Sequence, residues 1–171
     1  MATMTLLPNS SPGVGAGSGW SWSGGTSFHD VLDSNDGDTS YAASDGTNDG
    51  VFDITGFRDP TVAAADIASI TSVQYTTRGK RAIRSRLTAN CDFEYLVPSG
   101  FLETMNYATV YSTEDGTART TKPDGSVWTY SDLEGLQMRM TKNGIITLRL
   151  TYLAIIVTYI SSNTVFFGTN F

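Results

Sequence analysis

Apolar and polar residues alternate with a period of two along much of this sequence, and this alternation limits the fold more than any other feature. In "NCDFEYLV", residues 90–97, the side chains of Cys91, Phe93, Tyr95 and Val97 fall on one side and polar side chains fall on the other. Successive side chains of a β-strand point to opposite faces of the sheet. The pattern therefore predicts a strand with one buried face.

Other segments behave in the same way. In "GIITLRLTY", Ile146, Leu148, Leu150 and Tyr152 alternate with Thr and Arg residues. The next segment, 153–160, is apolar on both faces, which is typical of a central strand or of one beneath another layer. Further candidate strands, rich in Thr, Tyr, Val and Ile, are 51–55, 69–77, 81–88, 101–112, 117–121 and 136–141.

Turn-forming residues separate these segments. Asn-Gly at 143–144 lies between two alternating segments and is the strongest short-range hairpin signal in the chain. Asp-Gly at 115–116 separates two Thr- and Tyr-rich segments, and Pro-Asp-Gly at 123–125 predicts a turn before Trp128. Turns at this spacing are typical of an antiparallel sandwich.

Signals for helices are few. Asp59 as N-cap and Pro60 at the first helical position predict one or two turns of helix. Thr129 and Asp132 form a weak capping-box pattern for a single turn. The sequence therefore predicts an all-β fold, an antiparallel two-sheet β-sandwich of jelly-roll type with one or two short helical turns.

We expect this sandwich to occupy residues 27–160, after an extended Gly-rich N-terminal arm at 1–26 and before an apolar C-terminal tail at 161–171. An ordered arm with two tryptophans lies either against its own domain or against a neighbouring subunit, and both alternatives remain open. In the tail, burial of aromatic residues against a neighbour would be favourable. The candidate interface residues of the arm and the tail are Trp20, Trp22, Phe166, Phe167 and Phe171.

Charge is distributed unevenly. Residues 1–57 contain seven Asp and no Lys or Arg, whereas the rest of the chain contains ten acidic and eleven basic residues. The net charge of -6 therefore lies almost entirely in the first third of the chain. The acidic net charge disfavours nucleic acid as a partner, because neutralising its phosphates needs a basic face. The single cysteine, Cys91, cannot form an internal disulfide. Without a signal-peptide pattern or a run long enough to span a bilayer, we expect synthesis in a cytoplasm and no membrane partner.

The acidic stretch at 27–54 raises the question of a metal site. Its glycines and acidic residues do not match the spacing of an EF-hand loop. A calcium site of another kind would use Asp33, Asp36 and Asp38, whereas solvated turns explain the same composition without any ligand. We expect the turns, and we expect no cofactor.

No catalytic motif is recognisable, so we expect a protein that is not an enzyme. His29 is the only histidine. If residues 28–32 form a strand, Asp30 points away from His29, which disfavours a catalytic triad. Carboxylates such as Glu94 and Glu103 could in principle serve glycoside hydrolysis, but any β-rich protein contains such residues.

Five basic residues lie within "TTRGKRAIRSR", between residues 78 and 86. Arg84 and Arg86 share one face if this segment is a strand. A nucleic-acid contact is one explanation, but it is disfavoured because no aromatic residues are interleaved with the basic ones and the chain is acidic overall. A solvated strand face or hairpin is the second and more favoured explanation. The hypothesis of greater interest is that these residues contact the acidic 30–53 region of a neighbouring copy, because patches of opposite sign direct assembly.

Several short segments occur in a distinctive order. "HDVLDSNDGDTSYAAS" and "GVFDI" are followed by "SITSVQYTTRGKR", "KPDGSVWTYSDLEGLQMRM" and "LRLTYLAIIVTY". In this order they resemble segments of small β-sandwich virion proteins of tailed bacteriophages, over about residues 28–159. The resemblance implies a virion protein that decorates or cements a capsid, or that belongs to the neck or tail. Its implied partners are capsid or tail subunits and copies of itself, and it implies no catalytic residue.

A carbohydrate-binding module of a receptor-binding tail structure is the alternative, with a glycan as its partner. Jelly-roll sandwiches serve both roles, so the fold does not decide between them. Four aromatic residues could stack on sugars, although Trp128 is better suited to the core; they are Trp20, Trp22, Trp128 and Tyr130. An unrecognised hydrolase is the third and least favoured possibility.

Overall fold

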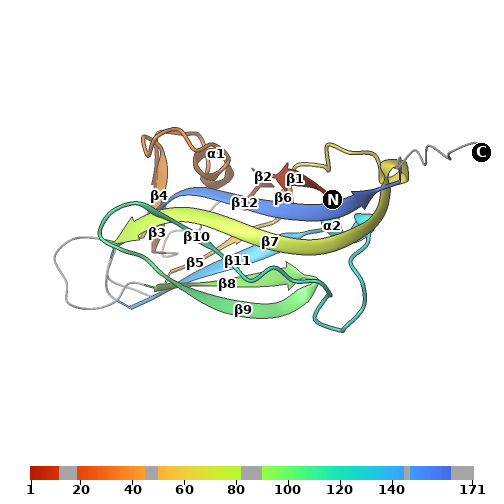
Figure 1. Ribbon diagram of the computed structural model, residues 1–171. Helices are drawn as coiled ribbons and strands as arrows, with labels where there is room; N and C mark the ends of the chain where they lie inside the picture. The colour runs from red at the N-terminus through yellow and green to blue at the C-terminus, as the bar shows by residue number, and fades with distance from the viewer. Residues whose placement is uncertain (12–18, 45–49, 82–89, 145–146, 163–171) are drawn as a thin grey trace, which may run out of the picture.

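The computed structural model describes residues 1–11, 19–44, 50–81, 90–144 and 147–162. Two antiparallel sheets form the two layers of a sandwich (Figure 1). The six-stranded sheet contains β1 (Ala2–Leu6), β3 (Trp20–Ser23), β4 (Tyr41–Ser44), β7 (Ile67–Arg81), β10 (Ser112–Asp115) and β12 (Leu148–Ser161). The four-stranded sheet contains β5 (Gly50–Ile54), β8 (Asn90–Val97), β9 (Ser99–Asn106) and β11 (Gln137–Asn143).

The smaller elements lie around this sandwich. A two-stranded ribbon pairs β2 (Pro8–Ser10) with β6 (Gly56–Phe57). Helix α1 (Phe28–Leu32) packs against β12, β4, β2 and β3, and helix α2 (Tyr130–Glu134) precedes β11. A single 3-10 turn, η1 (Ala64–Asp66), leads into β7. Neither helix in the described part of the chain is long and apolar enough to cross a membrane.

The strand order is that of a jelly roll. Strands β8 and β9 form a hairpin, and the pairs β7 with β10, β5 with β11 and β4 with β12 enclose it in sequence. These four nested pairs behave as one long hairpin that is rolled up, which brings β7 beside β12 and β8 beside β11. The nested pairs account for eight of the ten strands of the two sheets, and β1 and β3 extend the six-stranded sheet. The predicted all-β sandwich is therefore confirmed.

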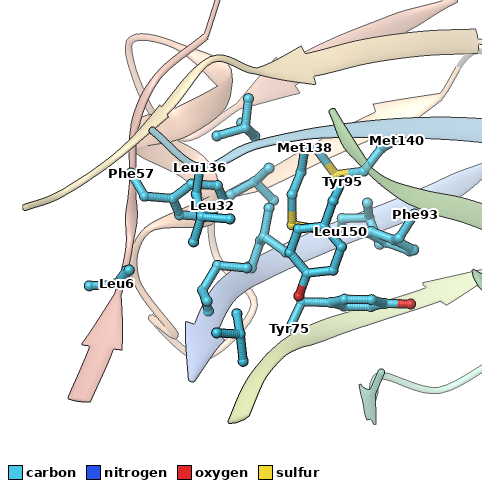
Figure 2. Close-up of a cluster of buried hydrophobic side chains, with 14 of the residues drawn as sticks. Leu6, Leu32, Phe57, Tyr75, Phe93, Tyr95, Leu136, Met138, Met140 and Leu150 are labelled. Atoms are coloured by element: carbon cyan, nitrogen blue, oxygen red, sulfur yellow. The ribbon is translucent and has the colours of Figure 1, made fainter. Parts of the chain in front are cut away.

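The core lies between the two sheets, and its composition follows from the alternation along each strand. Cys91, Phe93 and Tyr95 of β8 are buried, as predicted, whereas Val97 at the strand end is exposed. Figure 2 shows Tyr75 of β7 close to Tyr95, with Phe93 nearby. The Tyr75 and Phe93 rings stack at 5.1 Å between centroids. Aromatic pairs of this kind add stability beyond the area that they bury.

A β-bulge in β12 changes which side chains face the core. Leu148 and Leu150 point inward as predicted, but the register with β7 shifts between Leu150 and Tyr152. The bulged residue, Thr151, is buried, and the inward positions continue at Leu153 rather than at Tyr152. The prediction that Tyr152 shares a face with Leu150 is therefore wrong, because a bulge inserts one residue and reverses the alternation. The central position predicted for 153–160 is correct, since β12 pairs with β7 along one edge and with β4 and β1 along the other.

The predicted N-terminal arm needs a correction. Strand β1 pairs with β12 over five residues, and β3 pairs with β4 over four, so both strands belong to the six-stranded sheet of the sandwich. Met4 and Leu6 of β1 and Trp20 of β3 bury their side chains in the core. Of the two alternatives for this segment, the structure therefore shows the contact with its own domain, and the hydrophobic effect explains it.

Two local predictions were also wrong. Asn-Gly at 143–144 does not close a hairpin, because β11 and β12 belong to different sheets. Segment 117–121 forms only an isolated bridge between Arg119 and Val73 instead of a strand. Arg119 there pairs with Glu103 of β9 and accepts a hydrogen bond from the buried Trp128 indole through its carbonyl oxygen. The segment thus connects the edges of the two sheets.

The helical predictions had mixed outcomes. The capping box of Thr129 and Asp132 is present at the start of α2. Burial alone would raise the pKa of Asp132, but hydrogen bonds from Thr129 and Lys122 lower it below its ordinary value. The helix predicted after Asp59 is reduced to η1, because the following residues pair with β12 instead.

Candidate functional site

A cluster of basic and tyrosine side chains lies on the outer face of the six-stranded sheet. Along β7, Thr77 and Gly79 point into the core, so Arg78 and Lys80 point outward. Lys80 lies directly opposite Arg149 of β12 in the ladder. The register between β10 and β7 places Tyr111, the residue before β10, beside Lys80. We call Tyr41, Lys80, Tyr111 and Arg149, with the Asp38–Arg78 pair, the basic face.

Cation–π contacts hold the basic face together. The Lys80 ammonium lies 4.2 Å from the centre of the Tyr111 ring, and the Arg78 guanidinium lies 5.6 Å from it. The Arg149 guanidinium lies 4.3 Å from the centre of the Tyr41 ring. Burial raises the pKa of Tyr111, and the neighbouring Arg149 partly offsets this effect. Tyr111 is therefore neutral, and the rings of Tyr41 and Tyr111 orient the cations.

One of the three cations is neutralised within the chain. Arg78 binds Asp38 in a bidentate geometry, with nitrogen–oxygen distances of 2.8 and 2.9 Å. The bulged Thr151 donates a third hydrogen bond to Asp38 at 3.1 Å. The hydrogen bonds from Arg78 hold the pKa of Asp38 below its ordinary value. The bulge thus has a structural role, since it directs Thr151 toward the carboxylate that fixes Arg78.

Lys80 and Arg149 have a different environment. In the described part of the chain no carboxylate oxygen lies within salt-bridge distance of either side chain. Both residues are partly exposed. Two adjacent cations beside tyrosine hydroxyls are suited to bind carboxylates, because charge-assisted hydrogen bonds form there without breaking an existing ion pair.

The three aspartates considered as metal ligands have separate partners. Asp33 pairs with Arg58, and Asp38 pairs with Arg78. Asp36 accepts hydrogen bonds from Thr39 and Ser40, which lower its pKa to about 2. Across the described residues, no three His, Cys, Asp or Glu side chains come together in a way that could hold a metal ion. The described aspartates of this stretch act instead as partners of turns and of strand arginines.

This pairing changes the hypothesis of contact between the acidic stretch and the basic segment of a neighbouring copy. Asp38 and Arg78 belong to those two segments, and they bind each other within one chain. Asp53 of β5 likewise binds Arg139 of β11 at 2.8 Å. The other predicted interface residues of the basic segment and the tail lie outside the described residues; they are Arg84, Arg86, Phe166, Phe167 and Phe171.

The aromatic residues considered for glycan binding do not form one platform. Trp20 and Trp128 are buried, at 6% and 3% exposure, so sugars cannot stack on them. Trp22 is 40% exposed and packs edge-on against Phe28 of α1. Tyr130 lies apart from these, at the start of α2. The predicted core position of Trp128 is confirmed.

The residues considered for catalysis are also separated. His29 contacts the hydroxyls of Ser11 and Ser27, while the Asp30 carboxylate accepts hydrogen bonds from Thr26. Residues 28–32 form α1 and not a strand, so strand alternation does not determine the directions of His29 and Asp30. Glu94 and Glu103 lie on opposite faces of the four-stranded sheet, because Glu103 is opposite the buried Phe93.

The sequence indicated only part of the basic face. Arg78 and Lys80 stood within a recognised basic segment, and their spacing places them on one face of a strand. Tyr41, Tyr111 and Arg149 are far away in the sequence and reach this segment only through strand pairing. The alternation of "LRLTY" did indicate that Arg149 points outward.

Comparison with known proteins adds no family to this description. No protein-family model matches the sequence, and a search of curated proteins finds no match either.

Proposed function

We propose that the chain is a non-enzymatic structural protein of a tailed-bacteriophage virion, in a capsid-decorating or cementing role or in the neck or tail. In this role it stabilises the particle by binding other virion subunits. The observation that carries the proposal is the basic face, where Lys80 and Arg149 lack a carboxylate partner in the described part of the chain. The resemblance of the segment order to small virion proteins supports the same role.

The physical properties of the basic face favour a protein partner. Tyrosine and arginine are enriched at protein–protein interfaces, where one side chain provides both apolar area and hydrogen bonds. The neighbouring Val110 is 68% exposed, and it adds apolar area next to Tyr111. A flat strand surface with this composition fits an acidic, partly apolar protein surface better than it fits a neutral sugar.

Association with particles tests this function. The double variant Lys80→Gln and Arg149→Gln removes two positive charges from the basic face. We expect the variant to fold normally and to lose most of its co-sedimentation with purified particles. The matched control is Thr3→Glu and Thr5→Glu on β1, which changes the net charge equally at exposed positions of the same sheet. Retention of both variants at wild-type stoichiometry would contradict the proposal.

The tail is tested separately. Its sequence holds Phe166, Phe167 and Phe171, and we propose that these side chains bind a neighbouring subunit. Truncation after Ser162 leaves β12 complete, so it should release the protein from particles without unfolding it. Removal of residues 1–25 would not be informative, because it deletes strands of the six-stranded sheet.

A glycan array separates this function from the alternative. Binding to glycans that is lost in Trp22→Ala, together with absence of the protein from particles, would favour a carbohydrate-binding module. Trp22 is the informative position, since it is the exposed member of the two tryptophans of β3.

A further inference from the structure

The outer face of the four-stranded sheet has the opposite charge. Along β8 the core residues are Cys91, Phe93 and Tyr95, so Asp92 and Glu94 point outward. In the ladder Glu94 lies opposite Arg139 of β11. We call Asp92 and Glu94, with the Asp53–Arg139 pair, the acidic face.

The acidic face resembles the basic face in its organisation. Arg139 binds Asp53 in a bidentate geometry, at 2.8 and 3.0 Å. Asp92 accepts hydrogen bonds from the neutral side chains of Thr104 and Asn143. In the described part of the chain neither Asp92 nor Glu94 has a cation within salt-bridge distance. Each face therefore contains one bidentate ion pair and two charges of a single sign that form no salt bridge in the described part of the chain, although Glu94 interacts electrostatically with Arg139 and Lys80 with Asp38.

The spacing of the charges is also similar. Asp92 and Glu94 are two residues apart on one strand, which separates them by roughly 7 Å. Lys80 and Arg149 are direct neighbours on adjacent strands, which lie roughly 5 Å apart. Long Lys and Arg side chains can cover the difference of about 2 Å. Exposed apolar side chains accompany both charge pairs: Val110 lies near the basic face, and Leu102 lies opposite Glu94.

Two charged groups of the internal ion pairs also act on these charges: Asp38 is near Lys80, and Arg139 is opposite Glu94. Asp38 is shared with Arg78 and Arg139 with Asp53, so each face keeps an excess of two charges of its own sign. Among the described strand residues, Asp115 is a further carboxylate on the outer side of the six-stranded sheet, opposite Thr76 of β7. Thr76 is four residues along β7 from Lys80, or roughly 13 Å. This exceeds the Debye length of about 8 Å at physiological ionic strength. Lys80 and Arg149 therefore act as a local positive patch.

We propose that the basic face of one copy binds the acidic face of a second copy, so that the sandwiches stack sheet against sheet. This inference rests on the proposed function, and it names a second copy of the chain as one partner of the basic face. Because two different faces of the same chain meet, the contact is heterologous, and each bound copy leaves one basic and one acidic face free. Association therefore continues beyond a dimer, into a ring or a stack.

The size of the faces limits the affinity. Four strands of about eight residues cover roughly 500 Å², which is less than the roughly 800 Å² per partner of a standard stable interface. The contact is therefore weak in isolation and sensitive to salt. It becomes effective when particle binding holds copies side by side, because tethering raises their effective concentration.

Sedimentation of charge-reversed variants tests this contact. We expect wild-type protein at 0.01 M salt to show a weight-average mass that rises beyond the dimer with concentration. At 0.5 M salt the mass should return to that of the monomer, because the Debye length falls from about 30 Å to about 4 Å. The variant Lys80→Glu with Arg149→Glu, and the variant Asp92→Lys with Glu94→Lys, should each associate at least roughly tenfold more weakly, since attraction is replaced by repulsion.

A mixture of the two variants gives the decisive result. Each variant then meets faces of opposite charge, so the mixture should recover association at low salt. If Asp92→Lys disturbs folding through its hydrogen bonds to Thr104 and Asn143, Glu94→Lys alone replaces it in the same design. A monomeric wild type at low salt, or failure of the folded variants to associate when mixed, overturns the inference. Loss of particle binding in Lys80→Gln with Arg149→Gln would still support the proposed function in that case.

Discussion

The basic face and the acidic face of the sandwich are built alike but differ in the sign of their free charges. Each uses strand alternation to expose charged residues at fixed spacing, and each has one bidentate arginine–aspartate pair. The remaining charges are cations on one sheet and carboxylates on the other. The net charge of -6 therefore hides an opposite distribution of charge on the two sheets, which composition alone cannot reveal.

A rigid core holds the two faces apart, and the variant Phe93→Ala leaves a cavity in that core. Phe93 is fully buried and stacks on Tyr75 of the opposite sheet. We expect the free energy of unfolding to fall by about 3–5 kcal/mol, which is typical of the loss of a buried phenylalanine. Urea unfolding measures this value. A loss below about 1 kcal/mol would show that the two sheets are not packed as described.

The variant Lys142→Met tests the stability of the core independently of the two charged faces. Lys142 is the one fully buried charged residue among the described residues, and its ammonium has no hydrogen-bond partner there. An unpaired buried charge is costly, whereas methionine has a similar shape. We expect a gain in stability of about 1–3 kcal/mol, measured by thermal unfolding, with self-association unchanged. A loss of stability would mean that Lys142 has a stabilising partner.

The two internal ion pairs differ in solvent exposure, and matched variants measure how much each pair contributes to the free energy of unfolding. Asp38→Asn removes the partner of Arg78 and a hydrogen bond from Thr151, at side chains that are 18% and 26% exposed. Asp53→Asn removes the partner of Arg139 at side chains that are 24% and 40% exposed. We expect losses of about 1 kcal/mol for Asp38→Asn and about 0.5 kcal/mol for Asp53→Asn, because exposure weakens ion pairs. The reverse order would contradict this account of the basic face.

The smallest expected effect concerns acid. Side-chain hydrogen bonds from Thr39 and Ser40 lower the pKa of Asp36 from 3.8 to about 2. A carboxyl whose pKa is lower in the folded state stabilises the fold above pH 4, and this contribution disappears as the pH falls toward 2. Asp36 is exposed, so the effect stays below about 1 kcal/mol. Stability of wild type and Asp36→Asn should converge between pH 4 and pH 2. A constant difference over that range would exclude this role.

The sequence predicted the faces better than it predicted the connections between strands. Alternation identified the inward residues of β8, and therefore also the outward direction of Asp92 and Glu94. It failed at Thr151, because the bulge is stabilised by Asp38, more than 100 residues away in the sequence. It also failed at 143–144, since turn chemistry does not determine whether the next strand joins the same sheet.

The partners on the basic face could not be predicted for a related reason. Asp38 reaches Arg78, and Tyr111 reaches Lys80, only when the nested strand pairs have formed. Local patterns indicate which way a side chain points, but they do not indicate which distant residue lies beside it. The separate acidic and basic segments were therefore recognisable from the sequence, whereas the ion pair between them within one chain was not.

Zero-length carbodiimide cross-linking tests the contact between the basic and acidic faces, because it joins an amine to a carboxylate only when the two groups are in contact. Lys80 and Glu94 lie on opposite outer faces of one sandwich, so a link between them must join two copies. In a mixture of isotopically light and heavy protein at low salt, mass spectrometry should detect mixed-isotope peptides that link Lys80 to Asp92 or Glu94. Self-association without any such link would contradict the proposed contact between the basic and acidic faces.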